Sequence, residues 1–433
     1  MADPTPDPIP GSRGADASGA APGPGGRPGF RVRAALVCGR AVSRVSQLAG
    51  RGEGTVIGGL VALRIAPRVA ATLAGPMRVV LVSGTNGKTT TTRLVAEGLA
   101  TAGPTATNHT GSNLANGIAG ALLRSPDAVL AALEVDEAVV PWALEMVRPE
   151  VVVLLNLSRD QLDRMHEVRA TADRWQAALA AARPRLVVAN ADDPLVAFAA
   201  GDLPTVWVAA GLAWELDASA CPWCGALLTF TAEGWRCDGC GRARPACAFG
   251  LGDGLVETPH GPVALGLALP GRSAAANATM ALAAVEQLGV DPEAAVAQWR
   301  TIDSIEGRYQ RVTYRGADLH LHLAKNPAGW VDVLGLVGAT DDPVILGFNA
   351  QVQDGRDPSW IWDVPMELLA GRRVVCFGER ATDLAVRLVY AEVDVAVAET
   401  LAAAAELAGP GPVELIANYS AFQQVRSELA HGR

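Results

Sequence analysis

Short apolar runs alternate with amphipathic segments along most of the chain. In its first half the apolar runs fall at 79–82, 129–133, 151–155, 186–189 and 205–208, and segments with helical spacing fall between them, at 89–102, 138–146 and 170–182. Apolar strands that alternate with helices form a mostly parallel sheet with helices on both faces. The pattern therefore predicts an α/β fold.

A second series of apolar runs follows residue 308, at 319–323, 344–346, 374–377, 393–397 and 413–417. A chain of 433 residues is too long for one ordinary hydrophobic core. We therefore expect two α/β domains, over residues 30–302 and 303–433, the second of them Rossmann-like.

The N-terminal region differs from the rest of the chain. Residues 1–29 are dominated by Pro, Gly, Ala and Asp, a composition that predicts a disordered tail. Apolar positions from Val32 to Leu48 then predict an amphipathic helix over 30–48. After a glycine-rich loop, a second helix is expected to run to Leu73.

Elsewhere, the pattern predicts a helix over 274–288 that ends at Gly289. Asp291 and Pro292 then predict an N-cap and the first residue of the next helix.

Charge and hydropathy narrow the classes of function. The formal net charge is −9, so long-range electrostatics do not favour nucleic acid. No apolar run is long enough to cross a bilayer, and no secretory pattern opens the chain. We expect a cytoplasmic protein that could still act at a membrane surface.

The segment from 78 to 100 predicts a nucleotide-binding site. A strand leads into a glycine loop and then a helix, and such a loop turns backbone N–H groups toward phosphates. A lysine there pairs with the outer phosphates and a threonine hydroxyl binds Mg²⁺. The alternative is a plain Gly/Thr turn. The predicted ATP-binding residues are Gly84, Thr85, Asn86, Gly87, Lys88, Thr89 and Thr90, with Thr89 as a magnesium ligand.

Four cysteines form an insert at about 215–250. Cys221, Cys224, Cys237 and Cys240 have the spacing C-x₂-C-x₁₂-C-x₂-C, which suits four thiolates around one Zn²⁺. Because all four ligands are cysteines, the predicted zinc site is structural. The alternatives are a nucleic-acid-binding ribbon, for which three arginines among acidic residues are a weak basic footprint, a redox pair, and chance spacing.

The loop S-G-T-N-G-K-T-T resembles that of the Mur ligase superfamily, and further motifs agree over roughly 78–330. They include L-E-V-D-E from 133, N-L-S-R-D-Q-L-D from 156 and N-A-D-D-P from 190, although Gln161 replaces the usual histidine. The resemblance implies that Glu134 helps to hold Mg²⁺, that Asn277 lies near the base and that Arg308 reaches a phosphate. A surface acid at Glu134, a surface Arg308, and simple turn asparagines at Asn156 and Asn190 are the alternatives.

Residues 354–363 form a loop with three aspartates and two tryptophans. As pure structure, Asp354, Asp357 and Asp363 could serve turns, and the tryptophans could pack in the core. With the cysteine insert and L-A-K-N-P-A-G from 323, however, the motif D-G-x-D-x-S-W-I-W-D resembles the MurT family of lipid II isoglutaminyl synthases.

That resemblance implies a reaction and a partner. The chain would amidate the α-carboxylate of D-glutamate in the lipid II stem peptide through an acyl phosphate, as a step of peptidoglycan biosynthesis at the inner face of the membrane. Ammonia would come from GatD, a glutaminase subunit, in a heterodimer. An aspartate would complete the partner's Cys–His pair, with Asp357 the first choice before Asp354 and Asp363.

Two rival functions remain. Another Mur-type ligase would join an amino acid or glutamate to a muropeptide or folate. A non-catalytic nucleotide-sensing or nucleic-acid-binding module is the rival from a different class.

Overall fold

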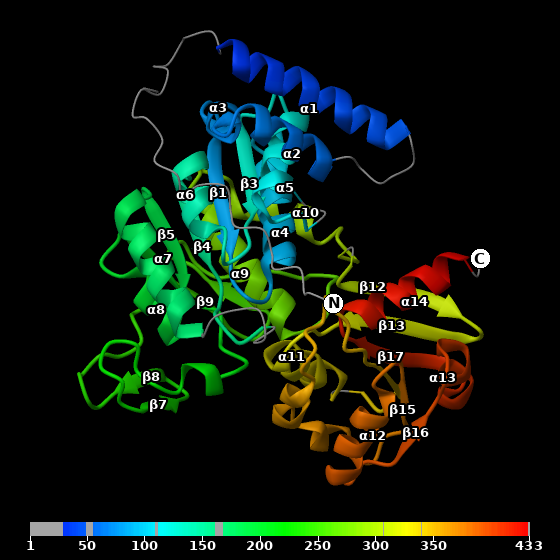
Figure 1. Ribbon diagram of the computed structural model, residues 1–433. Helices are drawn as coiled ribbons and strands as arrows, with labels where there is room; N and C mark the ends of the chain where they lie inside the picture. The colour runs from blue at the N-terminus through cyan, green and yellow to red at the C-terminus, as the bar shows by residue number, and fades with distance from the viewer. Residues whose placement is uncertain are drawn as a thin grey trace, which may run out of the picture.

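The structure is a computed structural model that describes residues 29–48, 55–108, 111–160, 168–305, 307–338 and 340–431. Two α/β units lie side by side, one coloured blue to green and the other yellow to red (Figure 1). The predicted α/β fold is confirmed. Two predictions lie outside the described residues: the disordered tail over residues 1–29, apart from Gly29, and the Q-L-D stretch at 161–163.

The larger sheet has nine strands among the described residues, in the order β11-β10-β9-β6-β5-β4-β1-β3-β2. Strands β2, β3, β1, β4, β5, β6 and β9 pair in parallel, whereas β10 pairs antiparallel with both β9 and β11. The five predicted strands are present, but β2 and β9 to β11 have only two or three residues each and were missed. The bounds are β1 (Arg78–Ser83), β2 (Thr105–Thr107), β3 (Leu130–Glu134), β4 (Val151–Leu154), β5 (Leu186–Asn190), β6 (Thr205–Ala209), β9 (Phe249–Leu251), β10 (Leu255–Glu257) and β11 (Val263–Ala264).

Helices cover both faces of this sheet because alternate residues of its strands point to opposite sides. Val80 and Val82 of β1 enter the core beneath one helical layer, while Val79 and Leu81 enter the other. One layer contains α4 (Lys88–Ala100), α9 (Arg272–Glu286) and α10 (Pro292–Trp299). The other contains α3 (Val69–Ala74), α5 (Ala115–Arg124), α6 (Val140–Val147), α7 (Val168–Ala182) and α8 (Pro194–Ala200).

The N-terminal helices form an outer layer over α5. The predicted helix is present as α1 (Phe30–Leu48), but a single second helix to Leu73 is wrong. The chain instead forms α2 (Thr55–Ile65) and then α3, because Pro67 between them has no N–H and cannot continue a helix. Within the described part of the chain, no helix is both long and apolar enough to cross a membrane.

The predicted helix boundaries near residue 290 are confirmed. Gly289 has a positive φ of 82° just beyond α9. Asp291 caps α10, since its side chain accepts a hydrogen bond from the N–H of Glu293, and Pro292 is the first helical residue.

The smaller sheet has the order β12-β13-β17-β14-β15-β16 and is parallel except for β12. Only Val312 of β12 is buried, so this strand resembles a polar loop in the sequence and was missed. The strands are β12 (Tyr309–Tyr314), β13 (Ala317–Leu323), β14 (Val344–Gly347), β15 (Val374–Phe377), β16 (Val395–Val397) and β17 (Gly411–Ala417). The helices are α11 (Pro327–Val337), α12 (Ala381–Tyr390), α13 (Leu401–Ala408) and α14 (Tyr419–His431), with 3₁₀ turns η2 (Ser359–Asp363) and η3 (Met366–Leu369).

The cysteine insert leaves the larger sheet after β6 and returns at β9. It contains the 3₁₀ turn η1 (Leu216–Ala218) and the hairpin β7 (Leu228–Thr231) and β8 (Gly234–Cys237). Trp223 lies between Phe198 and Trp235, with ring centroids 5.4 and 5.9 Å away. Aromatic packing therefore holds the insert against α8.

Candidate active site

A cavity of about 350 Å³ opens between the two units, beside the carboxyl ends of β1 and β4. Carboxyl ends of parallel strands are where α/β folds bind ligands. Eight of the predicted nucleotide-binding residues line this cavity, whereas Gly84 and Glu134 are not among the residues that do. The eight are Thr85, Asn86, Gly87, Lys88, Thr89, Thr90, Asn277 and Arg308.

The loop between β1 and α4 has a conformation that requires glycine. Gly84 and Gly87 have positive φ angles of 152° and 85°. A Cβ on Gly87 would lie 2.3 Å from Oδ1 of Asn277, and one on Gly84 would lie 2.8 Å from Cβ of Leu155. The loop therefore lies directly against the two segments that face it, and its shape depends on both glycines.

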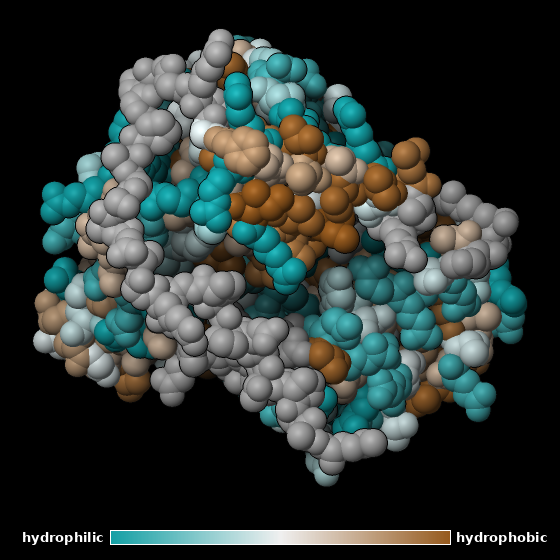
Figure 2. Space-filling view, turned by 45° about the horizontal axis from the view of Figure 1, so that its top comes forward, coloured by the Kyte–Doolittle hydropathy of each residue, from teal (hydrophilic) through white to brown (hydrophobic). Residues whose placement is uncertain are grey.

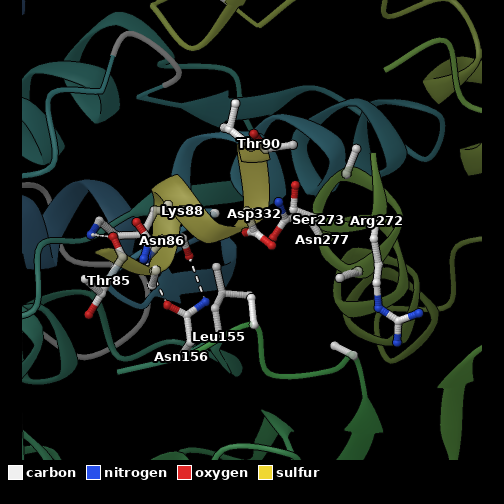
Figure 3. Close-up of a pocket in the computed structure, with 18 of the residues that line it drawn as sticks. Thr85, Asn86, Lys88, Thr90, Leu155, Asn156, Arg272, Ser273, Asn277 and Asp332 are labelled. Carbon is white, nitrogen blue, oxygen red and sulfur yellow. Dashed lines mark hydrogen bonds between the residues drawn. The ribbon is translucent and has the colours of Figure 1, made fainter. Parts of the chain in front are cut away.

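Asn156 fixes the loop from β4. Its Oδ1 accepts a hydrogen bond from the N–H of Asn86 at 2.9 Å, and its Nδ2 donates to the carbonyl of Asn86 at 3.1 Å. Figure 3 shows the amide of Asn156 pointing toward the loop, with its hydrogen bonds drawn as dashed lines. A second amide pair joins Asn86 to Asn326, which caps α11 in the smaller unit. Both units therefore brace the loop.

Lys88 is buried and forms an ion pair that the sequence did not predict. Its Nζ lies 2.9 Å from Oε2 of Glu137, and it also donates to the carbonyls of Gly84 and Thr85. Burial opposes a charge on Lys88, but the carboxylates of Glu137 and Glu134 outweigh it, so the pKa of Lys88 is raised. Burial likewise opposes a charge on Glu137, yet the Lys88 ammonium lowers its pKa. Both groups are therefore charged at neutral pH.

Glu134 has the properties of a cation ligand. It is fully buried at the end of β3, and its Oε1 accepts a hydrogen bond from Asn113 at 3.1 Å. Its Oε2 has no hydrogen-bond partner in the structure. A buried carboxylate oxygen with no donor is costly unless a cation binds it. The unpartnered Oε2 of Glu134 therefore fits a magnesium ion, and the predicted ligand Thr89 lines the cavity.

Asn277, Arg272 and Asp332 also line the cavity, and of the three Arg272 lies farthest from Asn156 in Figure 3. Burial raises the pKa of Asp332 to about 6, against the opposing charge of Arg272. Carboxylates with perturbed pKa values in a cavity are frequent at binding sites. Arg272 and Asp332 were not predicted from the sequence.

Three more contacts join the two units around the loop. Lys325 pairs with Asp160, and Arg159 pairs with Asp363 through Nη1 at 2.9 Å. Arg308 donates to the hydroxyl of Thr89 at 3.4 Å. The smaller unit therefore supplies part of the wall that faces the phosphate loop.

The three candidate aspartates differ in their surroundings. Asp354 is buried and accepts hydrogen bonds from the backbone N–H groups of Gln351 and Ser420. Asp363 is held by Arg159. Asp357 is exposed, and a hydrogen bond from the N–H of Ser359 lowers its pKa. Asp354 is therefore buried, whereas Asp357 and Asp363 are both exposed, and Asp363 is already paired with Arg159.

The four predicted zinc ligands come together at the tip of the insert. The sulfurs of Cys221, Cys224, Cys237 and Cys240 all lie within 4.8 Å of one another. Pairs of these sulfurs are 3.7 and 3.4 Å apart, close to the separation of about 3.8 Å expected for Zn–S bonds of about 2.3 Å in a tetrahedron. The cluster is consistent with a four-thiolate zinc site.

Comparisons with known proteins agree with this geometry. Residues 82–285 match the family model of the Mur ligase middle domain, and residues 323–422 match that of the MurT ligase C-terminal domain. The MurT subunit of lipid II isoglutaminyl synthase (glutamine-hydrolyzing) from Staphylococcus aureus strain N315 is 29% identical over 380 residues, which cover 81% of this chain and 86% of the relative. The corresponding subunit from Streptococcus pneumoniae is 28% identical over 78% of this chain and 82% of its own length.

Solved structures share the fold. A pseudomurein peptide ligase type C from Methanothermus fervidus has a TM-score of 0.64 at 19% identity, covering 82% of this chain and 79% of that one. Folylpolyglutamate synthase from Mycobacterium tuberculosis, complexed with ADP, has a TM-score of 0.59 at 17% identity, covering 93% and 99%. The fold and the phosphate loop define an ATP-dependent ligase of the Mur type. Within that class, the chain matches the MurT family model in its smaller unit and is similar to MurT subunits over most of its length.

Asp332 gives a prediction for the pH dependence of stability. Because its pKa is raised to about 6, the folded protein holds one proton more than the unfolded chain between about pH 4 and pH 6, and stability falls as pH rises through that window. Asp332→Asn should remove this penalty and raise the Tm by a few degrees at pH 7.5 but not at pH 4. Differential scanning calorimetry at both pH values measures the gain; an equal gain at both would contradict the assignment.

The cysteine cluster gives a second prediction. Cys224→Ser should abolish binding of one zinc per chain and lower the Tm, because metal binding contributes to folding. Metal analysis and thermal melting of the purified protein measure both effects. Cys38→Ser, at an exposed cysteine outside the cluster, is the matched control. Unchanged zinc content and melting in the Cys224 variant would show that the cluster holds no structural metal.

Proposed function

We propose that this chain is the ligase subunit of a glutamine-hydrolysing lipid II isoglutaminyl synthase. It would convert the α-carboxylate of D-glutamate in the lipid II stem peptide to an amide, as a step of peptidoglycan synthesis. The observation that carries the proposal is the match of the smaller unit to the MurT C-terminal family, next to a loop shaped for a polyphosphate.

The phosphate loop would bind ATP. Helix α4 begins in the wall of the cavity at Lys88, and the unpaired N–H groups of a helix's first turn attract phosphate. Lys88 is charged and already at the loop, so its Nζ needs only to exchange backbone carbonyls for phosphate oxygens. Asn277 and Asp332, which line the same cavity, would lie beside the nucleoside.

Magnesium would be held by Thr89 and Glu134, with Glu137 as a further carboxylate. When bound, it would neutralise charge on the phosphates during transfer. Arg308 already reaches the hydroxyl of Thr89 from the smaller unit. Arg308 would keep the smaller unit positioned beside the phosphoryl group during its transfer.

The proposed reaction has two steps. A carboxylate oxygen of D-glutamate attacks the γ-phosphorus of ATP, and the bond from that phosphorus to the β–γ bridging oxygen breaks. ADP departs, and an acyl phosphate remains. Ammonia then attacks the acyl carbon, phosphate departs, and loss of a proton from nitrogen gives the amide. The residues around the loop act by positioning and by charge stabilisation rather than by covalent catalysis.

Ammonia would come from a GatD-like class I glutaminase in a heterodimer. Asp357 is our choice for the residue that completes the partner's Cys–His pair, where a carboxylate orients the imidazole and favours its charged form. The exposure and lowered pKa of Asp357 support this choice over Asp354, which its own backbone neighbours occupy.

Two further assignments belong to this proposal. The zinc would be structural, since four thiolates leave no open coordination position. The protein would be cytoplasmic and would act at the inner face of the membrane, where lipid II presents its peptide.

The direct test combines the purified chain with its glutaminase, ATP, magnesium and lipid II. Amide formation with glutamine, and with ammonium in the absence of the glutaminase, is the expected result by mass spectrometry. Product formed only with an amino acid as acceptor, on a muropeptide or folate, would assign the chain to another kind of Mur-type ligase. Salt-sensitive nucleic-acid binding without ATP turnover would refute the ligase assignment itself.

Lys88 must be tested with its partner. Removing Lys88 alone leaves the buried Glu137 carboxylate unpaired, which destabilises a protein by about 3–5 kcal/mol. The paired variant Lys88→Met with Glu137→Gln removes both charges of the pair together and should fold, yet lose ATP-dependent amidation by at least about 100-fold. Glu137→Gln alone is the control for the carboxylate. Activity retained in the paired variant would remove the lysine from the mechanism.

Asp357→Asn should impair glutamine-driven amidation strongly but leave ammonium-driven amidation near that of the unsubstituted protein. The reason is that its proposed role is in the partner's glutaminase and not in phosphoryl transfer. Asp394→Asn, at an exposed aspartate elsewhere in the smaller unit, is the matched control. Equal losses in the two assays would refute the role of Asp357.

A further inference from the structure

Helix α1 has two apolar faces, and only one of them packs against the protein. The inner face carries Ala35, Gly39 and Ser43, which are buried against α2 and α5. The outer face carries an apolar residue at almost every turn and remains exposed. Its members, at helical spacing, are Phe30, Ala34, Val37, Ala41, Val45 and Leu48, which we call the outer stripe.

The outer stripe is unusually exposed for large apolar side chains. Phe30 is 85% exposed, Val37 68% and Leu48 89%. Helix α2 adds Val56, Ile57 and Leu60, which are also exposed. Figure 2 shows apolar residues gathered on the face formed by α1 and α2, with hydrophilic residues around them. A contiguous exposed apolar patch marks an interaction surface.

Close contacts at glycines fix the inner face of α1 against the protein. Rotation of α1 about its axis, which would bury the outer stripe, would break these contacts. A Cβ on Gly58 of α2 would lie 1.9 Å from Oγ of Ser43 in α1. A Cβ on Gly59 would lie 1.8 Å from the carbonyl of Asn116 in α5. Helices in such close contact form a rigid platform that presents the stripe outward.

The charge of these two helices favours an anionic binding partner. The chain as a whole carries a net charge of −9, but α1 and α2 contain no acidic residue. Arg33, Arg40 and Arg44 lie along one edge of the stripe and are exposed. A helix with an apolar face and arginines beside it is typical of a segment that lies in the interface of an anionic bilayer.

We propose that the face formed by α1 and α2 docks on the surface of an anionic phospholipid bilayer. The outer stripe enters the headgroup boundary while the arginines contact lipid phosphates. The platform rests on α5, and Asn113, just before α5, bonds Glu134 of the candidate site. Docking would therefore set the orientation of that site toward the membrane. The inference goes beyond the proposed reaction and does not depend on it.

The test measures cosedimentation of the full-length protein with vesicles that contain no lipid II. The protein should bind vesicles of phosphatidylcholine mixed with phosphatidylglycerol, and added salt should weaken the binding. Arg33→Gln with Arg44→Gln should lower the partition coefficient between vesicles and water by about 25-fold. Each arginine near the membrane surface contributes about a fivefold factor. Arg169→Gln with Arg236→Gln removes two arginines from α7 and β8 and is the matched control.

A second variant tests the apolar contribution. Val37→Gln with Leu48→Gln should weaken vesicle binding by at least about tenfold while the Tm and ATP turnover stay unchanged, since both side chains are exposed.

Several outcomes would overturn the proposal. Equal binding to phosphatidylcholine alone, equal losses in the control variant, or no vesicle binding would refute it. Self-association abolished by the Val37 and Leu48 substitutions, without vesicle binding, would assign the stripe to a second copy of the chain. Binding that appears only after removal of residues 1–28 would assign the stripe to that segment instead. None of these results affects the amidation assay, so the two proposals fail separately.

Discussion

The structure of the candidate site depends on one buried ion pair. Lys88 and Glu137 lie 2.9 Å apart and almost without contact to water, so either charge alone would be costly. The pair keeps an ammonium group at the phosphate loop before any nucleotide binds. Glu134, also buried and with one oxygen lacking a partner, makes the same region suitable for a cation. The charged groups of the site are therefore in position before substrate binds, which is the condition for electrostatic stabilisation of a transition state.

The two units depend on each other at this loop. Asn86 pairs with Asn156 from its own unit and with Asn326 from the other. Lys325 and Asp160 form a second link beside it. A nucleotide bound in the cavity would therefore contact both units. A movement of one unit relative to the other would change the geometry of the loop.

Local patterns made the fold and the loop predictable. The loop between β1 and α4 was found because its glycines, lysine and threonine are adjacent in sequence. The pairing of Asn86 with Asn326 could not be predicted, because its partners are 240 residues apart, and that of Lys325 with Asp160 spans 165 residues. The outer stripe was missed for another reason. The pattern that predicted α1 combined Val32 and Leu36 of the inner half with Val37, Val45 and Leu48 of the outer face, and apolar spacing alone does not say which side is covered.

The proposed function requires the loop at residues 84–89 to bind the polyphosphate of ATP, with Lys88 as its fixed cation. A crystal structure with a nonhydrolysable ATP analogue and magnesium tests it most directly. We expect phosphate density within hydrogen-bonding distance of Lys88 Nζ and of the loop N–H groups. We also expect metal density beside Thr89 and Glu134, and the base near Asn277. An analogue bound elsewhere, or a loop closed by its own side chains under saturating nucleotide, would contradict it.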